Sequence, residues 1–438
     1  MRKSFLFRLI ALLLAFGLIA AACGDDDDDD GTAAGDDSAT SDDGGAGDDG
    51  GAGDDGAPAG DCDDSDQGPI KLGIVAQVAF YAGIEDGVKA RIERANAEGG
   101  ICGRMLEFTK TIDDNSDPQA NLDGARDLVE NDGVYAIVTT SAVLLPQTTD
   151  YLAEQQIPFS GWGFMPGYCL PNEWGFGFNG CLSGWGFGIE GAKPSLAVSD
   201  PVAELVGKED FSIVLFNSDD TAGEGGSKLY NHLWGDQILA EDFVPTAGAI
   251  TDTTPYVNLV LDNNPDVVIL STDFAGALTL KPAIIAAGYE GPVIDYTTYV
   301  PGLLTDENTA AALEGGYSNT QIPPSEEGRP ATQQIATDLE AAGLTPFVTM
   351  GASIGYWGTD TLIQLIEAAA AAGSTDKDTF NQVANVDGVD LSYPEGGLCP
   401  HNSAENHLQP VPGAALVQVV DGAYVSAVEF SCWRLLDE

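Results

Sequence analysis

One short motif in the chain could carry catalysis, but it lacks the surroundings that catalysis needs. Residues 351–355 read Gly-Ala-Ser-Ile-Gly, which matches the Gly-x-Ser-x-Gly pattern of a serine nucleophile. A nucleophile elbow needs a strand before the serine, a helix after it and a histidine partner. The apolar lead-in to Ser353 is short, and the downstream histidines, His401 and His407, lie in a polar loop rich in proline and asparagine. We therefore expect that the protein is not an enzyme.

Two glycine patterns and the same two histidines could indicate a cofactor or a metal. Residues 175–180 and 186–191 match Gly-x-Gly-x-x-Gly, but neither follows an apolar strand, as a dinucleotide site requires. His401 and His407 are six positions apart, which is not a helical metal spacing. We predict no cofactor and no metal.

Six of the seven cysteines lie beyond residue 60. An even number in an exported chain favours disulfides, although six cysteines allow 15 connectivities. The pairs that we predict are Cys62–Cys102, Cys169–Cys181 and Cys399–Cys432. The second of these closes a short loop. No spacing is Cys-x-x-Cys, so the cysteines do not indicate zinc.

The stretch 161–187 is rich in glycine and in aromatic residues. Aromatic side chains supply a large apolar contact area with few rotamers to freeze, which suits a ligand-binding wall. They could equally pack the Cys169–Cys181 loop onto the protein, and the sequence leaves both roles open. The aromatic residues are Trp162, Phe164, Tyr168, Trp174, Phe176, Phe178, Trp185 and Phe187.

Apolar strand patterns alternate with helical patterns along the chain. The first series predicts strands at 70–75, 105–111, 135–138 and 157–160, with helices at 83–97, 117–129 and 146–155. The second predicts strands at 211–216, 266–271 and 292–296, with helices at 225–239 and 276–287. Repeated strand–helix units favour mostly parallel sheets with helices on both faces, and two series favour two lobes.

Five segments, taken in order, carry a family resemblance. They are Ile-Lys-Leu-Gly-Ile at 70–74, Gly-Gly-Ile-Cys-Gly-Arg at 99–104, Asp-Asp-Asn-Ser-Asp-Pro at 113–118, Asn-Ser-Asp-Asp at 217–220 before Gly-Glu-Gly at 223–225, and Asn-Pro-Asp-Val-Val at 264–268 before Ala-Gly-Tyr at 287–289. Together they resemble the leucine/isoleucine/valine-binding protein family over most of residues 69–430.

This resemblance implies an α/β fold, the two-lobed type I periplasmic-binding clamshell that serves ABC importers. Each lobe would be a mostly parallel sheet with helices on both faces. Lobe one would hold residues 69–190 and 321–408, and lobe two 191–320 and 409–438, with three crossovers at the hinge. A small molecule would bind between the lobes at the carboxyl ends of the strands, and the lobes would close on it. The resemblance also places Ser353 inside a helix that runs to Ala372.

The resemblance further implies which residues contact the ligand. A hydroxyl after the third strand would hold an α-carboxylate, at Ser141 or, with a slip of one residue, at Ala142. Backbone groups after the fourth strand map near Gly163 and Met165. The first-loop aromatic residue maps to Phe80 or Tyr81. The predicted ligand-binding residues are Tyr81, Ser141, Trp162, Gly163, Phe164, Asp273, Phe274, Tyr296 and Thr297.

Two departures from the family pattern bear on the ligand. Ala222 stands where the family has a tyrosine, and Thr297 falls near the position of the acid that meets a ligand ammonium group. Asp273 could replace that acid, or it could merely cap the helix that begins near Gly276. We expect a branched-chain or other amino acid, or a related amide or carboxylate.

The start of the chain predicts export and a membrane anchor. Residues 1–22 combine three basic residues with an apolar run of 14, shorter than the about 20 that span a bilayer, and so predict a signal peptide. The run ends Ile-Ala-Ala-Ala-Cys, which resembles a bacterial lipobox; an ordinary cleavage site beside a chance cysteine is the alternative. We predict that Cys23 is lipidated and that 23–67 is a disordered acidic tether, which holds the protein on the outer face of the cell membrane.

The formal net charge of −52 restricts the partners. Such an acidic chain argues against nucleic acid and against an anionic membrane surface. The predicted partners are a small-molecule ligand, the membrane subunits of an ABC permease and, through the lipid, the membrane; we expect a monomer. The alternatives are a sensor domain that signals to a membrane partner and a lipid-anchored serine hydrolase.

Overall fold

The computed structural model describes residues 62, 64–182, 184–194, 197–246 and 250–435. These residues belong to one compact unit, Ala57–Glu438. The predicted signal peptide, Cys23 and all but the end of the predicted tether lie outside the described residues. Within the described ranges, no helix has both the length and the apolar character needed to cross a bilayer.

The first lobe is built on a five-stranded sheet in the order β2-β1-β3-β4-β5, in which all neighbours are parallel. Its strands are β1 (Ile70–Ala76), β2 (Leu106–Asp113), β3 (Ala136–Thr140), β4 (Phe159–Gly161) and β5 (Gly175–Gly177). All five residues of β3 are buried, without the alternation of a strand that faces water on one side. This is the pattern of a parallel sheet covered on both faces.

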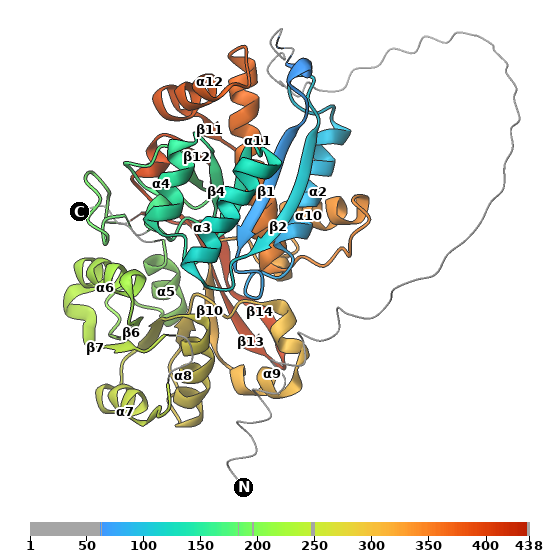
Figure 1. The fold of residues 1–438 in the computed structure, drawn as a ribbon. Coiled ribbons are helices and arrows are strands. Elements are labelled where there is room, and N and C mark those ends of the chain that lie inside the picture. The colour runs from blue at the N-terminus through green and yellow to red at the C-terminus, as the bar shows by residue number, and fades with distance from the viewer. Residues whose placement is uncertain (1–61, 63, 183, 195–196, 247–249, 436–438) are drawn as a thin grey trace, which may run out of the picture. The chain divides into compact units, whose positions relative to one another are not determined.

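Helices from two parts of the chain cover this first sheet (Figure 1). They are α2 (Ile84–Ala97), α3 (Pro118–Asp127), α4 (Pro146–Glu154), α10 (Pro330–Ala341), α11 (Met350–Ala371) and α12 (Lys377–Asn381). Three of them begin with proline, whose missing N–H is not needed in the first turn of a helix. Residues from α10, α11 and α12 share one hydrophobic core with β1 and β3, so the chain returns to the first lobe after residue 320.

Glycine explains the close packing of α2 against α11. A Cβ added at Gly87 would lie 1.9 Å from the carbonyl oxygen of Ala352, and one at Gly355 would lie 2.1 Å from that of Ile84. Larger residues would therefore force the two helices apart. The glycines of the Gly-x-Ser-x-Gly motif thus have a packing role, and Ser353 lies inside α11, as predicted.

The second lobe is built on a seven-stranded sheet in the order β14-β13-β10-β9-β8-β6-β7. Its strands are β6 (Ile213–Ser218), β7 (Ile238–Val244), β8 (Val267–Ser271), β9 (Val293–Asp295), β10 (Tyr317–Thr320), β13 (Gly413–Val420) and β14 (Ala423–Cys432). The five strands β6 to β10 are parallel to one another. The β13–β14 hairpin adds two antiparallel strands at the edge beside β10.

Alternate residues of β6 show that helices cover both faces of the second sheet. Ile213 and Leu215 pack with residues of α5 and α6, whereas Val214 and Phe216 pack with residues of α7 and α8. These helices are α5 (Ser199–Val206), α6 (Thr221–Trp234), α7 (Thr254–Asn263) and α8 (Phe274–Ala286), and α9 (Glu307–Leu313) follows. The predicted fold class, with two mostly parallel sheets and helices on both faces, is confirmed.

One predicted helix has the wrong limits. The helix expected at 225–239 begins at Thr221, because Asp220 caps it by accepting a hydrogen bond from Gly223 N. It ends at Trp234, where Gly235 takes a positive φ of 36°. Ile238 and Leu239, which continue the helical apolar pattern in the sequence, belong to β7.

All three predicted disulfides are present, linking Cys62 to Cys102, Cys169 to Cys181 and Cys399 to Cys432. The first joins the start of the described chain to the loop before β2. The third joins the end of β14 to the segment that contains the short antiparallel pair β11 (Asp390–Leu391) and β12 (His401–Asn402).

Candidate functional site

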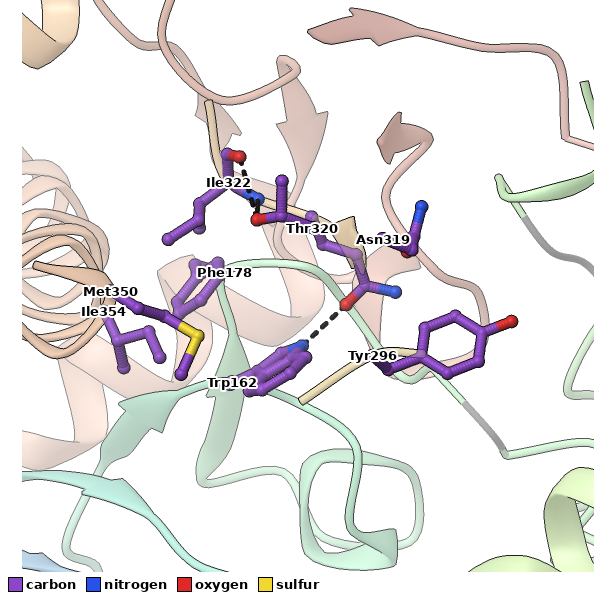
Figure 2. Close-up of a pocket in the computed structure, with 9 residues that line it drawn as sticks. Trp162, Phe178, Tyr296, Asn319, Thr320, Ile322, Met350 and Ile354 are labelled. Carbon is purple, nitrogen blue, oxygen red and sulfur yellow. Dashed lines mark hydrogen bonds between the residues drawn. The ribbon is translucent and has the colours of Figure 1, made fainter. Parts of the chain in front are cut away.

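A pocket lies where the carboxyl ends of parallel strands from the two sheets meet (Figure 2). Ligands of open α/β sheets bind outside this edge, because loops and helix N-termini converge there. Its cavity volume is about 10 Å³, room for about one water molecule, so the side chains of the site nearly fill it in this conformation. A larger ligand would require the lobes to part. Its lining residues are Trp162, Phe178, Tyr296, Asn319, Thr320, Gln321, Ile322, Met350 and Ile354.

Both lobes contribute to this lining. Trp162 directly follows β4, and Tyr296 directly follows β9. Residues 319–322 complete β10 and start the crossover to the first lobe, and Met350 begins α11. The pocket is therefore lined by both lobes and by the segment that connects them after β10. A change in the angle between the lobes would change its shape.

Aromatic rings form one wall of the site. The Trp162 ring lies 5.4 Å from that of Phe164 and 6.3 Å from that of Tyr81, both edge to face. Phe80 of the first lobe meets Phe274 of the second, with ring centroids 5.3 Å apart. Edge-to-face pairs at these distances are favourable. The wall thus holds three of the predicted aromatic residues together, and Phe274 contacts Phe80 from the second lobe. Of these four predicted residues, only Trp162 is among those that line the pocket.

Gln321 connects the crossover to the first lobe. Its Oε1 accepts a hydrogen bond of 2.6 Å from Trp162 Nε1, the dashed line at that ring in Figure 2, and one of 2.7 Å from Asn179 Nδ2. These bonds fix the plane of the indole ring that faces the pocket.

Tyr296 lines the pocket from the second lobe. Its ring stacks on that of Tyr230 at a centroid distance of 6.5 Å, and its hydroxyl points away from the other labelled side chains in Figure 2. Burial raises the pKa of Tyr296 well above its ordinary value, and neighbouring Tyr230 adds to the effect. The group is therefore a neutral phenol at physiological pH.

Ser141 and Gly163 are buried, and both make hydrogen bonds within the first lobe. Ser141 Oγ accepts from Val143 N at 3.1 Å, which closes the turn after β3. Gly163 N donates to Asn179 Oδ1 at 2.6 Å, and the carbonyl of Gly163 accepts from Leu182 N. In this conformation both residues shape the loops behind the aromatic wall.

Asp273 and Thr297 support loops of the second lobe. Asp273 is the N-cap of α8, and its Oδ1 accepts from Gly276 N at 2.7 Å. This is the capping role that the sequence left open beside ligand binding. Thr297 N donates to Asp295 Oδ1 at 2.6 Å, so the loop after β9 is held by the acid two residues earlier.

Asp295 itself is paired with a buried lysine. The side chains of Lys281 and Asp295 are 1% and 0% exposed, and Lys281 Nζ forms an ion pair with Asp295 Oδ2. Lys281 Nζ also donates to Thr298 Oγ1 and to the carbonyl of Tyr317. Burial lowers the pKa of Lys281, and Asp295 opposes that shift. This acid therefore neutralises an internal charge and does not supply the acid that is missing at Thr297.

The other aromatic residues of 161–187 serve three different purposes. Tyr168, Trp174 and Phe176 are buried in the core of the first lobe. Phe178 lines the pocket beside Trp162. Trp185 lies 4.4 Å from the ring of His232 on α6, so it packs the first crossover against the second lobe. Different residues of this stretch therefore line the pocket and pack the core, and their contact with a ligand stays a prediction.

The motifs that could have indicated catalysis or a cofactor have structural roles. Gly175–Gly177 is itself a strand, and 186–191 form turns, so neither pattern joins a strand to a helix. Burial lowers the pKa of His401 and of His407 to about 4, which leaves both neutral. His401 Nδ1 is 2.9 Å from the carbonyl of Cys399, and His407 Nε2 is 2.8 Å from Asn385 Oδ1.

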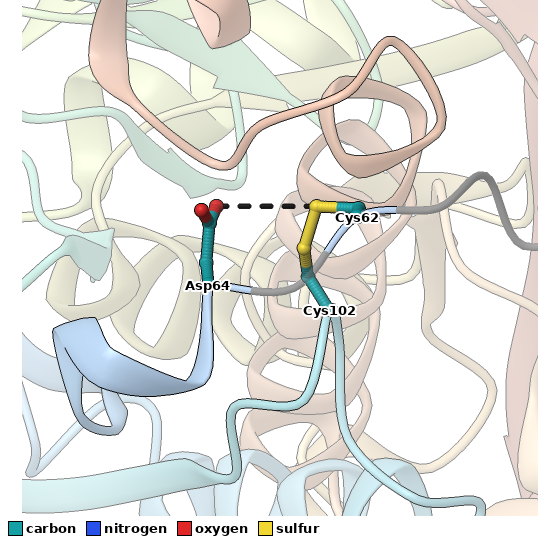
Figure 3. Close-up of side chains that lie close together, drawn as sticks. All are labelled: Cys62, Asp64 and Cys102. Carbon is teal, nitrogen blue, oxygen red and sulfur yellow. Dashed lines mark hydrogen bonds between the residues drawn. A yellow bond between two sulfur atoms is a disulfide. The ribbon is translucent and has the colours of Figure 1, made fainter.

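One cluster in the described part of the chain has the composition of a metal site. Cys62, Asp64 and Cys102 bring two sulfurs and a carboxylate within 4.8 Å of one another (Figure 3). The two sulfurs form a disulfide, and a metal requires thiolates. Asp64 instead accepts from Thr375 N and Thr375 Oγ1, both at 2.7 Å, and so ties the start of the chain to the segment before α12.

Several pocket residues were not predicted from the sequence. Asn319 lies near the end of β10, and Gln321 and Ile322 start the crossover that follows it, at the predicted lobe boundary. Met350 precedes the Gly-x-Ser-x-Gly motif and Ile354 lies within it, and the sequence indicated that motif only as a possible nucleophile. The predicted lobe boundary at residue 321 could have indicated these residues, because a segment that crosses between two lobes borders the cleft between them.

Comparison with known proteins identifies the class. The chain belongs to the periplasmic binding protein family, whose sequence model matches residues 73–423. No curated protein is significantly similar to it in sequence. The predicted family and the two-lobed type I periplasmic-binding fold are confirmed.

Three solved structures of similar fold illustrate the family. The solute-binding protein of an R. palustris ABC transporter, in complex with benzoate, has a TM-score of 0.62 and 16% identity over 84% of this chain and 98% of that one. The fatty acid ABC transporter substrate-binding protein from Thermomonospora curvata has a TM-score of 0.65 and 18% identity, over 83% and 92%. The leucine-binding protein LivK from Thermotoga maritima has a TM-score of 0.62 and 14% identity, over 84% and 99%.

Proposed function

We propose that this protein captures a small molecule outside the cytoplasm and delivers it to an ABC importer. The observation that carries the proposal is the pocket lined from both lobes at the carboxyl ends of their strands. The three crossings of the chain between the sheets support it, since they form the hinge on which such a pocket would close. Membership of the periplasmic binding protein family supports it independently.

The proposed contact residues are the aromatic groups at the cleft. Trp162, Phe164 and Tyr81 would meet the ligand from lobe one, residues 69–190 and 321–408. Phe274 and Tyr296 would meet it from lobe two, residues 191–320 and 409–438. Ser141, Gly163, Asp273 and Thr297 would hold the loops that place these rings.

The proposal includes a membrane anchor. Cys23 would carry the lipid, and the acidic segment 24–67 would let a monomer reach the permease from the outer face of the cell membrane. Support comes from the lipobox-like end of the apolar run and from the composition of the segment after it.

A thermal-shift screen tests the proposal. A ligand that binds only the native state raises the melting temperature, by an amount that grows with its concentration over Kd. The library would contain amino acids, amides, polyamines, aromatic acids and an extract of growth medium. We expect at least one positive component, with a smaller shift in W162A than in wild type.

The control variant is W433F. Trp433 lines a separate surface pocket beside Arg434, and its substitution should leave the ligand-induced shift unchanged. A library and an extract that produce no shift at any concentration would contradict the proposed function.

A further inference from the structure

We propose that the ligand is an uncharged, flat molecule such as an aromatic amide or a neutral heterocycle, and that it carries neither a carboxylate nor an ammonium group. The inference rests on the proposed function and specifies the ligand of the same cleft. The sequence predicted an amino acid or a related amide or carboxylate, and of these the inference keeps only the amide.

The first lobe has no free cradle for a carboxylate at the two strand ends where one was expected. After β3, Ala142 N donates to Gln77 Oε1 at 3.2 Å, and Val143 N donates to Ser141 Oγ. After β4, Trp162 N donates to Thr140 Oγ1 at 3.2 Å, and Gly163 N donates to Asn179 Oδ1. A ligand carboxylate would have to compete with these side chains for each N–H group.

On the second lobe, aspartates occupy the corresponding positions. Asp220 accepts from Gly223 N after β6, and Asp273 accepts from Gly276 N after β8. Asp295 accepts from Thr297 N and Thr298 N after β9. Three carboxylates therefore already lie at three strand ends of this lobe. The N–H groups at these strand ends are therefore already occupied by carboxylates, and Asp295 is itself neutralised by Lys281. A ligand carboxylate would have to compete for N–H groups on this lobe as well.

The pocket itself is neutral. None of the nine residues that line it in Figure 2 is charged. Lys281, which lies inside α8, is paired with Asp295. An ionised group without a partner is strongly disfavoured in such surroundings.

The same lining is suited to a flat neutral molecule. Trp162, Phe178 and Tyr296 offer aromatic surface, which favours stacked or edge-on rings. Gln321 Oε1 and Asn319 Nδ2 are engaged within the protein, which leaves Gln321 Nε2 and Asn319 Oδ1 as the neutral hydrogen-bonding atoms of these two side chains. They complement a ligand carbonyl and a ligand N–H group, respectively.

The first experiment identifies what the protein retains. Full-length protein would be incubated with growth-medium extract, washed and denatured, and the released compounds identified by mass spectrometry. An uncharged aromatic or heteroaromatic compound at one equivalent supports the inference. A retained compound with a carboxylate or an ammonium group overturns it but leaves solute capture intact. If no compound is retained, the proposed function itself is contradicted, and the inference fails with it.

The second experiment isolates the charge. Benzamide and benzoate have nearly the same shape, and calorimetry compares their affinities for the same protein. We expect benzamide to bind at least 10-fold more tightly than benzoate. Equal affinity, or tighter binding of benzoate, would overturn the inference.

The engagement of the N–H groups can be checked without a ligand. Hydrogen exchange of the peptides that contain Ala142 and Gly163 should be slow in wild type. In N179A the Gly163 amide loses its acceptor and should exchange at least 10-fold faster, whereas Ala142 should be unaffected. Fast exchange at both amides in wild type would show that the cradle is open and would contradict the inference.

Discussion

Single residues determine the electrostatics of the cleft. The sequence placed Trp162 and Tyr296 at the ligand site through their family resemblance, and both line the pocket. It did not show that Asn179 occupies the N–H of Gly163, or that Lys281 neutralises Asp295, because these partners are distant in sequence and meet only after folding. The sequence alone therefore could not predict that Asn179 and Lys281 disfavour a charged ligand.

The Lys281–Asp295 pair predicts a large loss of stability on K281M. The substitution leaves Asp295 buried without its counter-charge, which typically costs about 3–5 kcal/mol. The measurement is the free energy of unfolding from urea titration. K208M is the matched control, because Lys208 pairs with Asp266 at the surface, where such pairs contribute about 0–1 kcal/mol. Equal losses in the two variants would refute the importance assigned to the buried pair.

Asp266 predicts a pH effect. Lys208, together with Ser212, lowers the pKa of Asp266 from 3.8 to about 2. A pKa that is lower in the folded state adds stability above pH 4, and this stability is lost as the pH falls toward 2. D266N should therefore be less stable than wild type at pH 6, and the difference should shrink between pH 4 and pH 2.

Unfolding titrations at several pH values measure that difference. D262N is the control, since the side chain of Asp262 is exposed and makes no hydrogen bond or ion pair with any described residue. Its profile should run parallel to that of wild type. A D266N profile that is also parallel to wild type would contradict the assignment.

At the scale of elements, most of the fold was predictable. Period and composition predicted β1 to β4 and α2 to α4 within a few residues, because parallel strands are continuous apolar runs and helices carry caps and prolines. They did not predict β5, α10 or α12, and α11 was expected only from the family resemblance. The end of α6 was missed because apolar residues continue into β7 in a helix-like pattern. The disulfide pairs were predicted among 15 connectivities, and the structure confirms them.

The Cys62–Cys102 disulfide should stabilise the folded protein by tying down the start of the folded unit. It closes a loop with a sequence separation of 40, for which loop entropy gives about 4 kcal/mol. C62S/C102S should therefore unfold at a clearly lower urea concentration. Thiol titration of the denatured variant, without reductant, should find none of the four remaining predicted partners free. An unchanged unfolding midpoint would contradict the prediction.

At the scale of the whole molecule, the two lobes define the working unit. The family and the fold were predictable because five short segments occur in the right order over most of the chain. The ligand was not, because its identity depends on a few side chains at the hinge, such as Gln321, that share no pattern in the sequence.

The proposed lipid anchor on Cys23 predicts where the C23A variant is found after cell fractionation. Without the cysteine no lipid can be attached, so the exported variant should move from the membrane fraction to the soluble fraction. Fractionation and immunodetection measure this. C62S is a suitable control, because it removes a different cysteine and should remain membrane-bound. A C23A protein that stays as firmly bound as wild type would refute the anchor.

Native mass spectrometry tests the central claim, capture of one small molecule in the cleft between the lobes, most directly. Wild type and W162A would be incubated with the compound that the protein retains, and their intact masses measured. We predict a one-to-one complex with wild type and at least 10-fold less complex with W162A, because the indole faces the pocket. Equal occupancy of the two proteins, or no complex with wild type, would contradict the account.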